Sequence, residues 1–129
     1  IMASILRVNT LTDASSNNSI ATSFVAGGSS KAWIHLTGSG TPTAEDSLNN
    51  SSVTDGGTGL FTFNFSSNFG NIHYCAASMA GNAGETTDGR HQMPNAELTA
   101  SAFQVRNVSG TNSVADDANI FIIFHGDLA

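Results

Sequence analysis

The four histidines of this chain are its best metal-ligand candidates, because neutral imidazole is a common ligand of protein-bound zinc. His35, His73 and His125 lie in apolar alternating segments, and His91 lies in a polar one. His73 and Cys75, two residues apart, share one face of an extended strand. Two ligands do not complete a site, so we predict no metal and no cofactor. The alternative is a metal held by three histidines where three copies of the chain meet.

Two adjacent carboxylate pairs, Glu45-Asp46 and Asp116-Asp117, are the candidates for acid–base catalysis such as glycoside hydrolysis. Neighbours on an extended chain point to opposite sides, and both pairs lie in turn-like sequence, where carboxylates accept bonds from backbone N–H groups. No serine stands in a G-x-S-x-G sequence, and no lysine follows the GTG and GNAG turns as a phosphate-binding loop requires. We therefore predict that the chain is not an enzyme.

A long polar segment, 81–95, is the candidate ligand-binding loop, because loops on β-scaffolds often carry recognition residues. Its candidate contact residues are Glu85, Asp88, Arg90 and His91. Trp33 or Tyr74 could add an aromatic platform for the apolar face of a sugar. The alternatives are that the loop is a surface connection or an inter-subunit clasp, and that Trp33 fills a core or an interface.

The composition restricts the partners of the chain. Charged residues make up 11% of it, well under the roughly 25% of typical soluble domains, and the net charge is −6. The negative charge repels a phosphate backbone, so we predict no nucleic-acid binding. We also predict no membrane insertion, because no run of 18 apolar residues is present. Cys75, the single cysteine, is predicted to be a small buried residue, with an intermolecular bridge or a nucleophile as the alternative.

Strands must position these residues, because β-branched and aromatic alternation recurs and helical periodicity is almost absent. The length of 129 residues predicts one domain. Residues 1–19 are expected to form a strand and a polar linker for assembly or docking, and residues 20–129 an antiparallel β-sandwich. The predicted strands are Ser4–Thr10, Ile20–Val25, Lys31–Thr37, Leu48–Val53, Leu60–Phe65, Ile72–Met79, Glu97–Val108 and Asn119–His125.

Two strands carry sharper predictions. After the hairpin signal Asp55-Gly56-Gly57, the alternation of Leu60–Phe65 directs three phenylalanines into the core: Phe61, Phe63 and Phe65. The last strand is apolar on both faces, whereas one face of an antiparallel sheet is usually wet. It therefore needs a second cover, which we predict to be a homo-oligomer interface. The predicted interface residues are Ile120, Phe121, Ile122, Ile123 and Phe124.

Four segments carry a resemblance to a known class of proteins. They are ASILRVNTLTDASSNNS, SKAWIHLTGSGT, DSLNNSSVTDGGTGLFTFNFSSNF and HYCAASMAG. The first resembles the leader of small virion proteins of marine tailed bacteriophages, and the others resemble a pattern in cyanophage and pelagiphage tail-fibre and structural proteins. The chain departs from that pattern at the GGTGLF turn, at Cys75 and in a lengthened 81–95 segment.

The resemblance implies a non-enzymatic structural protein on the surface of the virion, either a fibre module or a surface-decoration module. It further implies a homotrimer with a jelly-roll or H-type-lectin-like sandwich. The expected partners are other copies of the chain, other virion proteins and host surface glycan. A lectin-like receptor-binding domain that recognises cell-surface glycan is the alternative function.

Overall fold

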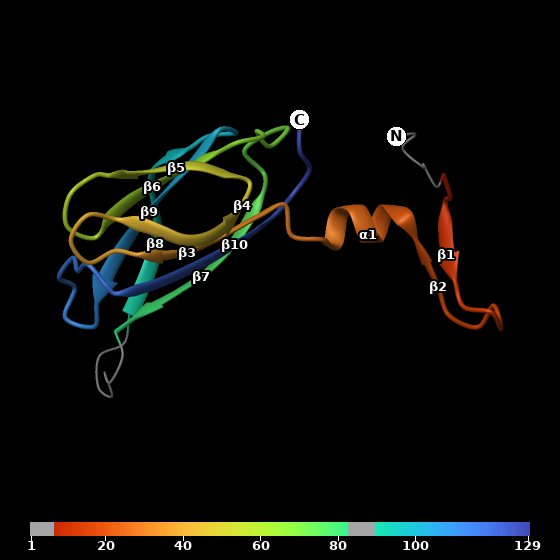
Figure 1. Cartoon of the computed structure of the whole chain (residues 1–129), viewed down its shortest axis with the longest axis horizontal. Helices are drawn as coiled ribbons and strands as arrows, with labels where there is room; N and C mark the ends of the chain where they lie inside the picture. The colour runs from red at the N-terminus through yellow and green to blue at the C-terminus, as the bar shows by residue number, and fades with distance from the viewer. Residues whose placement is uncertain (1–6, 83–89) are drawn as a thin grey trace.

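Two four-stranded antiparallel sheets form the body of the chain in a computed structural model, which describes residues 7–82 and 90–129 (Figure 1). Sheet I has the order β4 (Thr43–Leu48), β3 (Ala32–Thr37), β10 (Asn119–His125) and β7 (Cys75–Gly81). Sheet II has the order β5 (Asn50–Asp55), β6 (Leu60–Phe65), β9 (Ala102–Ser109) and β8 (Arg90–Leu98). The predicted all-β, sandwich-like class is confirmed.

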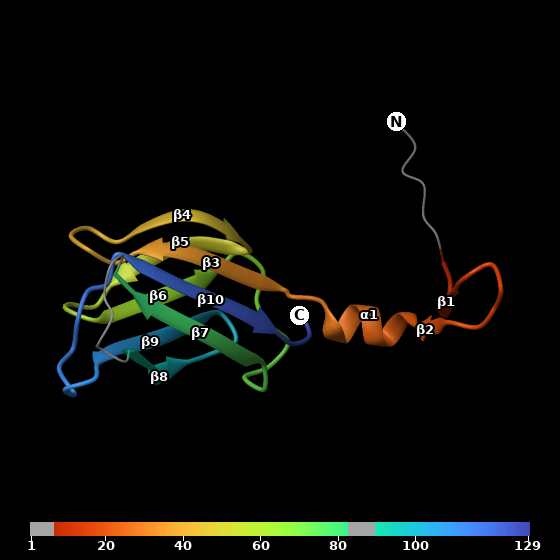
Figure 2. The ribbon, with the colours of Figure 1, turned by 90° about the horizontal axis from the view of Figure 1, so that it is seen from below.

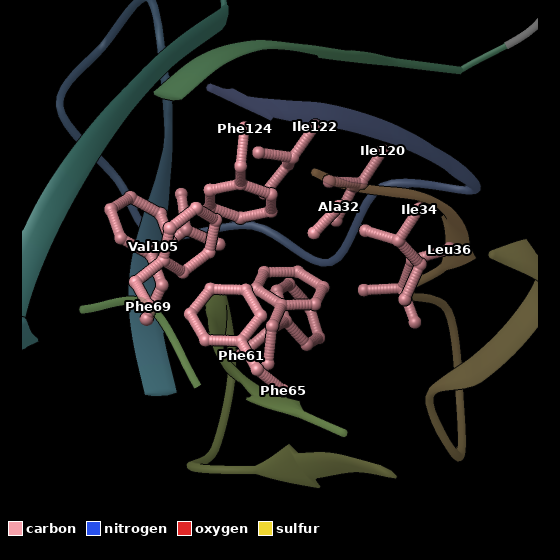
Figure 3. Packing of buried hydrophobic residues seen from close by; sticks show 12 residues of the cluster. Ala32, Ile34, Leu36, Phe61, Phe65, Phe69, Val105, Ile120, Ile122 and Phe124 are labelled. Carbon is pink, nitrogen blue, oxygen red and sulfur yellow. The ribbon is translucent and has the colours of Figure 1, made fainter. Parts of the chain in front are cut away.

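The core lies between the two sheets and, in sheet I, follows the strict alternation of the central strands (Figure 3). In β3 the buried positions are Ala32, Ile34 and Leu36, and in β10 they are the apolar residues at 120, 122 and 124. Ile34 pairs directly with Ile122, so the two buried stripes of sheet I are in register. From sheet II, Phe61, Phe63 and Phe65 enter the same core with exposed fractions of 0%, 2% and 7%, which confirms their prediction as core residues.

An aromatic cluster closes one end of this core. The ring of Phe65 meets Phe69, Phe124 and Tyr74 edge to face, with centroids 4.9, 5.1 and 5.7 Å apart. Tyr74 also stacks on Phe69 at 4.5 Å. Its hydroxyl donates to the carbonyl oxygens of Thr99 and Ala102, at 3.0 and 3.2 Å. Because the polar end of the ring is bonded, Tyr74 can pack within the cluster at little cost.

The β5–β6 hairpin forms at the predicted Asp55-Gly56-Gly57 sequence. The Asp55 carboxylate accepts the N–H of Gly57 at 2.8 Å, and Gly57 has a φ of 103°. Gly59 has a φ of 69°, and a Cβ atom there would lie 2.7 Å from the carbonyl oxygen of Asn107. The hairpin therefore requires glycine at position 59 for two independent reasons, its φ and its close packing.

A buried polar contact fixes the connection that leads into β10. Asp117 and Asn107 are both fully buried, and the Asn107 amide donates to the Asp117 carboxylate at 2.5 Å and to the Ala115 carbonyl at 2.8 Å. The Asn82 amide donates to the same carboxylate at 3.0 Å. Buried carboxylates require such donors, so this connection is held by side chains as well as by packing.

An N-terminal arm precedes the sandwich and projects away from it (Figures 1 and 2). It contains the hairpin of β1 (Thr10–Thr12) and β2 (Ser19–Ala21), followed by α1 (Thr22–Gly28). The Asp13 carboxylate closes the hairpin loop, and the Asn18 side chain and the Asn17 N–H that bond to it lower the pKa of Asp13. All positions of α1 are described, and none of them is buried.

The structure corrects the boundaries of several predicted elements. The strand predicted at Ile20–Val25 is the end of β2 followed by α1, and the sandwich begins at Ala32 rather than at residue 20. The strand predicted at Leu48–Val53 is the junction of β4 and β5, which turns at Asn49 with a φ of 58°. Glu45 and Asp46, expected in turn-like sequence, therefore lie in β4.

The second half of the chain needs similar corrections. The strand predicted at Glu97–Val108 is split by a turn, in which the Ala102 N–H donates to the Thr99 hydroxyl at 2.9 Å. β7 begins at Cys75 rather than at Ile72, and β8 already begins at Arg90, inside the predicted loop 81–95. The described part of the predicted strand Ser4–Thr10 forms β structure only at Thr10.

Candidate assembly surface

The outward-facing side of sheet I, which we call the outer face, carries two rows of side chains across its four strands. In the first row, Trp33 of β3 pairs with Leu48 of β4 and with Ile123 of β10, which in turn pairs with Ala77 of β7. In the second row the corresponding residues, from β4 to β7, are Asp46, His35, Phe121 and Met79. Side chains of directly paired residues lie on the same side of a sheet, so the rows form one largely apolar surface.

These side chains enclose a shallow outer groove of about 420 Å³. The side chains of the outer face that line it are Trp33, His35, Ala77, Met79, Phe121 and Ile123. Phe121 is 41% exposed and Ile123 39% exposed, although both are large and apolar. A second hollow, lined by Met79, Gly81, Asn119 and Phe121 among others, extends the apolar surface toward the end of β7.

His35 is the polar side chain built into the outer groove. Its ring stacks on that of Phe121, with centroids 4.4 Å apart and planes 20° from parallel. Its Nε2 lies 3.2 Å from Oδ1 of Asn119, which orients the imidazole. The groove therefore offers a wide apolar contact with few groups for hydrogen bonds, a composition suited to another apolar surface.

The residues predicted to form an oligomer interface divide between two sides of β10. Ile120, Ile122 and Phe124 are core residues with exposed fractions of 0%, 2% and 1%, so their prediction as an interface is corrected. Successive side chains of a strand point to opposite faces, so these three point into the core and Phe121 and Ile123 point outward. A partner can reach Phe121 and Ile123 on the outer face.

The two residues predicted as an aromatic platform lie on opposite sides of sheet I. Trp33 lines the outer groove, whereas Tyr74 packs against the core beside Phe69. Burial raises the pKa of Tyr74 to about 12, because the phenolate would lose solvation. The structure therefore does not bring the two rings together.

The structure places the predicted loop residues only in part. Glu85 and Asp88 lie outside the described residues. Arg90 and His91 begin β8, where they pair with Ser109 and Val108, so they belong to a strand rather than to a loop. Their backbone positions are fixed by the ladder with β9.

Cys75 is exposed and free, which corrects the prediction that it is buried. It pairs with His125 at the end of β7, on an edge strand that leaves its side chain uncovered. His73 is exposed as well. Among the described residues, no three histidine, cysteine or carboxylate side chains are grouped to hold a metal ion.

The carboxylates considered for catalysis all have structural partners. Glu45 accepts a bond from the Thr37 hydroxyl at 3.0 Å, and Asp46 accepts the N–H of Ser47 at 2.8 Å. Asp116 accepts the N–H of Gly59 at 2.7 Å, and Asp117 belongs to the buried contact with Asn107. The two carboxylates of each adjacent pair thus have different partners and different surroundings, as expected for neighbours on an extended chain.

Sequence reasoning missed part of the candidate surface. Leu48, Ala77 and Met79 join the outer face because β4 and β7 align with β3 and β10, and such long-range pairing is not visible in the individual strands. It also missed the exposed apolar side chains of α1, of which Phe24 is 72% exposed. The available signal was the sequence SFVAG, an apolar segment without charge just before the sandwich.

The fold and this surface define a class of protein: an antiparallel two-sheet β-sandwich with an apolar outer face and a projecting N-terminal arm. No family model, no curated protein and no solved structure matches the chain. Within the described residues, no helix has the length and apolar character needed to cross a membrane.

Proposed function

We propose that this chain is a non-enzymatic structural module of a bacteriophage virion, located on the particle surface as a fibre or decoration protein. Its copies assemble through the outer face of sheet I, as a homotrimer. The observation that carries the proposal is the apolar row of Leu48, Trp33, Ile123 and Ala77, with Phe121 and Met79 beside it. Contiguous exposed apolar surface of this kind marks interaction sites.

Two further features support assembly as the role of the chain. The outer groove contains almost no charge, so a partner can cover it without the cost of desolvating ions. The arm provides a second surface for contacts with other copies or with other virion proteins, the role predicted for residues 1–19. The segments similar to marine-phage virion proteins favour a virion over other assemblies.

Sedimentation velocity tests the assembly, because it gives the mass of the particle in solution. We expect the wild-type chain to sediment as an oligomer at micromolar concentration and Phe121→Ser to sediment as a folded monomer. Val114→Ser, which alters an exposed apolar residue in the β9–β10 connection, is the matched control and retains the wild-type mass. A monomeric wild-type chain contradicts the proposal.

The virion location needs a separate test. Gold-labelled antibodies against the chain are expected to decorate phage particles in electron micrographs, at the tail or on the head. Purified particles that contain the chain in neither place contradict the virion role, whatever the oligomeric state. The jelly-roll or H-type-lectin-like arrangement of the strands stays a prediction.

Glycan recognition is the second candidate function, supported by the aromatic floor of the outer groove. Trp33 lies there beside His35, and an indole ring can cover the apolar face of a sugar. Sugar binding also needs several hydrogen bonds, and the imidazole of His35 already contacts Asn119. We therefore rank it second. A glycan array with the wild-type chain and Trp33→Ala distinguishes it from pure assembly.

A further inference from the structure

The arm carries a second set of exposed apolar side chains that the sandwich of its own chain leaves uncovered. These are Val8, Leu11, Ile20, Phe24 and Val25, each at least 39% exposed. A helix of seven residues without a buried face gains little stability from its own backbone. The arm would therefore gain stability from a partner that covers these side chains.

Hydrogen bonds hold the junction of arm and sandwich, from which α1 projects away from the two sheets (Figures 1 and 2). The Lys31 N–H and the Ser30 hydroxyl both donate to the carbonyl oxygen of Phe124, at 2.9 and 3.2 Å. The Lys31 ammonium donates to the carbonyl oxygens of Ala26 and Ser29 at the end of the helix. The bonds to Phe124 extend the pairing of β3 with β10, and the Lys31 ammonium links this end of the sheet to the end of α1.

We propose that α1 of one copy occupies the outer groove of a second copy, with Phe24 and Val25 against Phe121, Ile123 and Met79. This inference rests on the proposed role in assembly and names the surface that makes the contact. α1 contains no charged residue, and the groove it would enter is apolar. The contact therefore buries apolar side chains without burying an unpaired charge.

Reaching the size of a specific interface requires the whole arm along the outer face, because α1 supplies two of the five exposed apolar side chains of the described arm. The exposed apolar side chains of the arm and of the outer face together present an area on the order of 1,000 Å², about the minimum for a specific interface. The arm reaches a neighbour because about 10 Å of extended chain at residues 29–31 separates α1 from β3. The contact joins two different surfaces, so each copy both gives an arm and receives one.

Matched serine variants test the exchange in the full chain. Phe24→Ser is expected to weaken self-association by about ten- to a hundredfold, as judged by sedimentation, because it removes the largest exposed side chain of the arm. Val114→Ser is the control and retains the wild-type association. Circular dichroism is expected to show folded sheets in both variants, because both positions are exposed.

The serine variants also separate this inference from the proposed assembly. If Phe121→Ser is monomeric while Phe24→Ser associates like the wild type, the outer face assembles without the arm and the exchange is wrong. If the wild-type chain itself is monomeric, both proposals are wrong. Equal weakening by Phe24→Ser and Phe121→Ser, with little extra effect in the double variant, supports the exchange.

Disulfide trapping gives an independent readout. In a Cys75→Ser background, a Val25→Cys chain mixed with an Ala77→Cys chain is expected to form a cross-linked dimer on mild oxidation. A Val25→Cys chain mixed with Thr54→Cys, an exposed position on sheet II, is the control and stays uncrosslinked. Equal yields in the two mixtures overturn the proposal. So does a bridge within single chains that carry both Val25→Cys and Ala77→Cys.

Discussion

Ile122 and Ile123 are adjacent in β10 and face opposite ways, so replacing each by alanine tests the division between core and outer face. Ile122→Ala removes three carbon atoms from a side chain that is 2% exposed. At about 0.8 kcal/mol for each buried carbon, and with the cost of the cavity left behind, the expected loss of unfolding free energy is about 3–4 kcal/mol. Ile123 is 39% exposed over an open groove, so the expected loss is about 1 kcal/mol.

Urea unfolding followed by circular dichroism measures both losses, at protein concentrations low enough to keep the chain monomeric. Both residues lie in the same central strand, so differences in β-propensity cancel. Unchanged m-values are expected, because neither variant alters the surface exposed on unfolding to a large extent. Equal losses in the two variants, or a larger loss for Ile123→Ala under these conditions, would refute the assignment of the faces.

Three further predictions address the turns and the buried polar groups. Tyr74, the single tyrosine, is expected to ionise with a pKa of about 12 in the folded chain, because burial favours its neutral form. The stability that this burial of the neutral ring contributes is lost as the pH rises from about 10 to about 12. An absorbance titration centred near 10 would contradict this prediction. Gly59→Ala is expected to lower the free energy of unfolding by about 2–4 kcal/mol in thermal unfolding. Gly40 has a similar φ of 74° but open space around it, so Gly40→Ala is expected to cost about 1 kcal/mol. Equal costs would rule out the close contact at Gly59 as the cause. Asn107→Ala is expected to cost about 2–3 kcal/mol in urea unfolding, because the buried carboxylate of Asp117 loses a donor; a neutral result would show that this bond contributes nothing to stability.

The sequence predicted the elements whose determinants are local. The phenylalanine alternation of Leu60–Phe65 and the apolar strand Asn119–His125 have the bounds expected from period-two patterns. The glycine turn before β6 was also predictable, because positive φ values strongly favour glycine. The period-two alternation also allowed Phe61, Phe63 and Phe65 to be assigned to the core.

Other features depend on contacts that a single segment does not reveal. Asn49 ends β4 by adopting a positive φ, which asparagine tolerates but does not require. α1 contains too few turns for a helical period and ends in two glycines, so its pattern reads as a strand followed by a turn. The outer face arises from the pairing of β10 with both β3 and β7, and therefore only the tertiary structure brings Trp33, Ile123 and Ala77 into one row.

The bonds that hold Ser30 and Lys31 to Phe124 also bear on how many copies an assembly contains. A contact between two different surfaces repeats with a fixed rotation from each copy to the next, and it closes into a ring only when that rotation divides a full circle. The direction in which the arm leaves the sandwich sets the rotation. The proposed homotrimer needs one third of a circle per copy, so under the proposed exchange a few residues at this junction would determine the number of subunits. An altered exit angle would yield a ring of another size or an open filament.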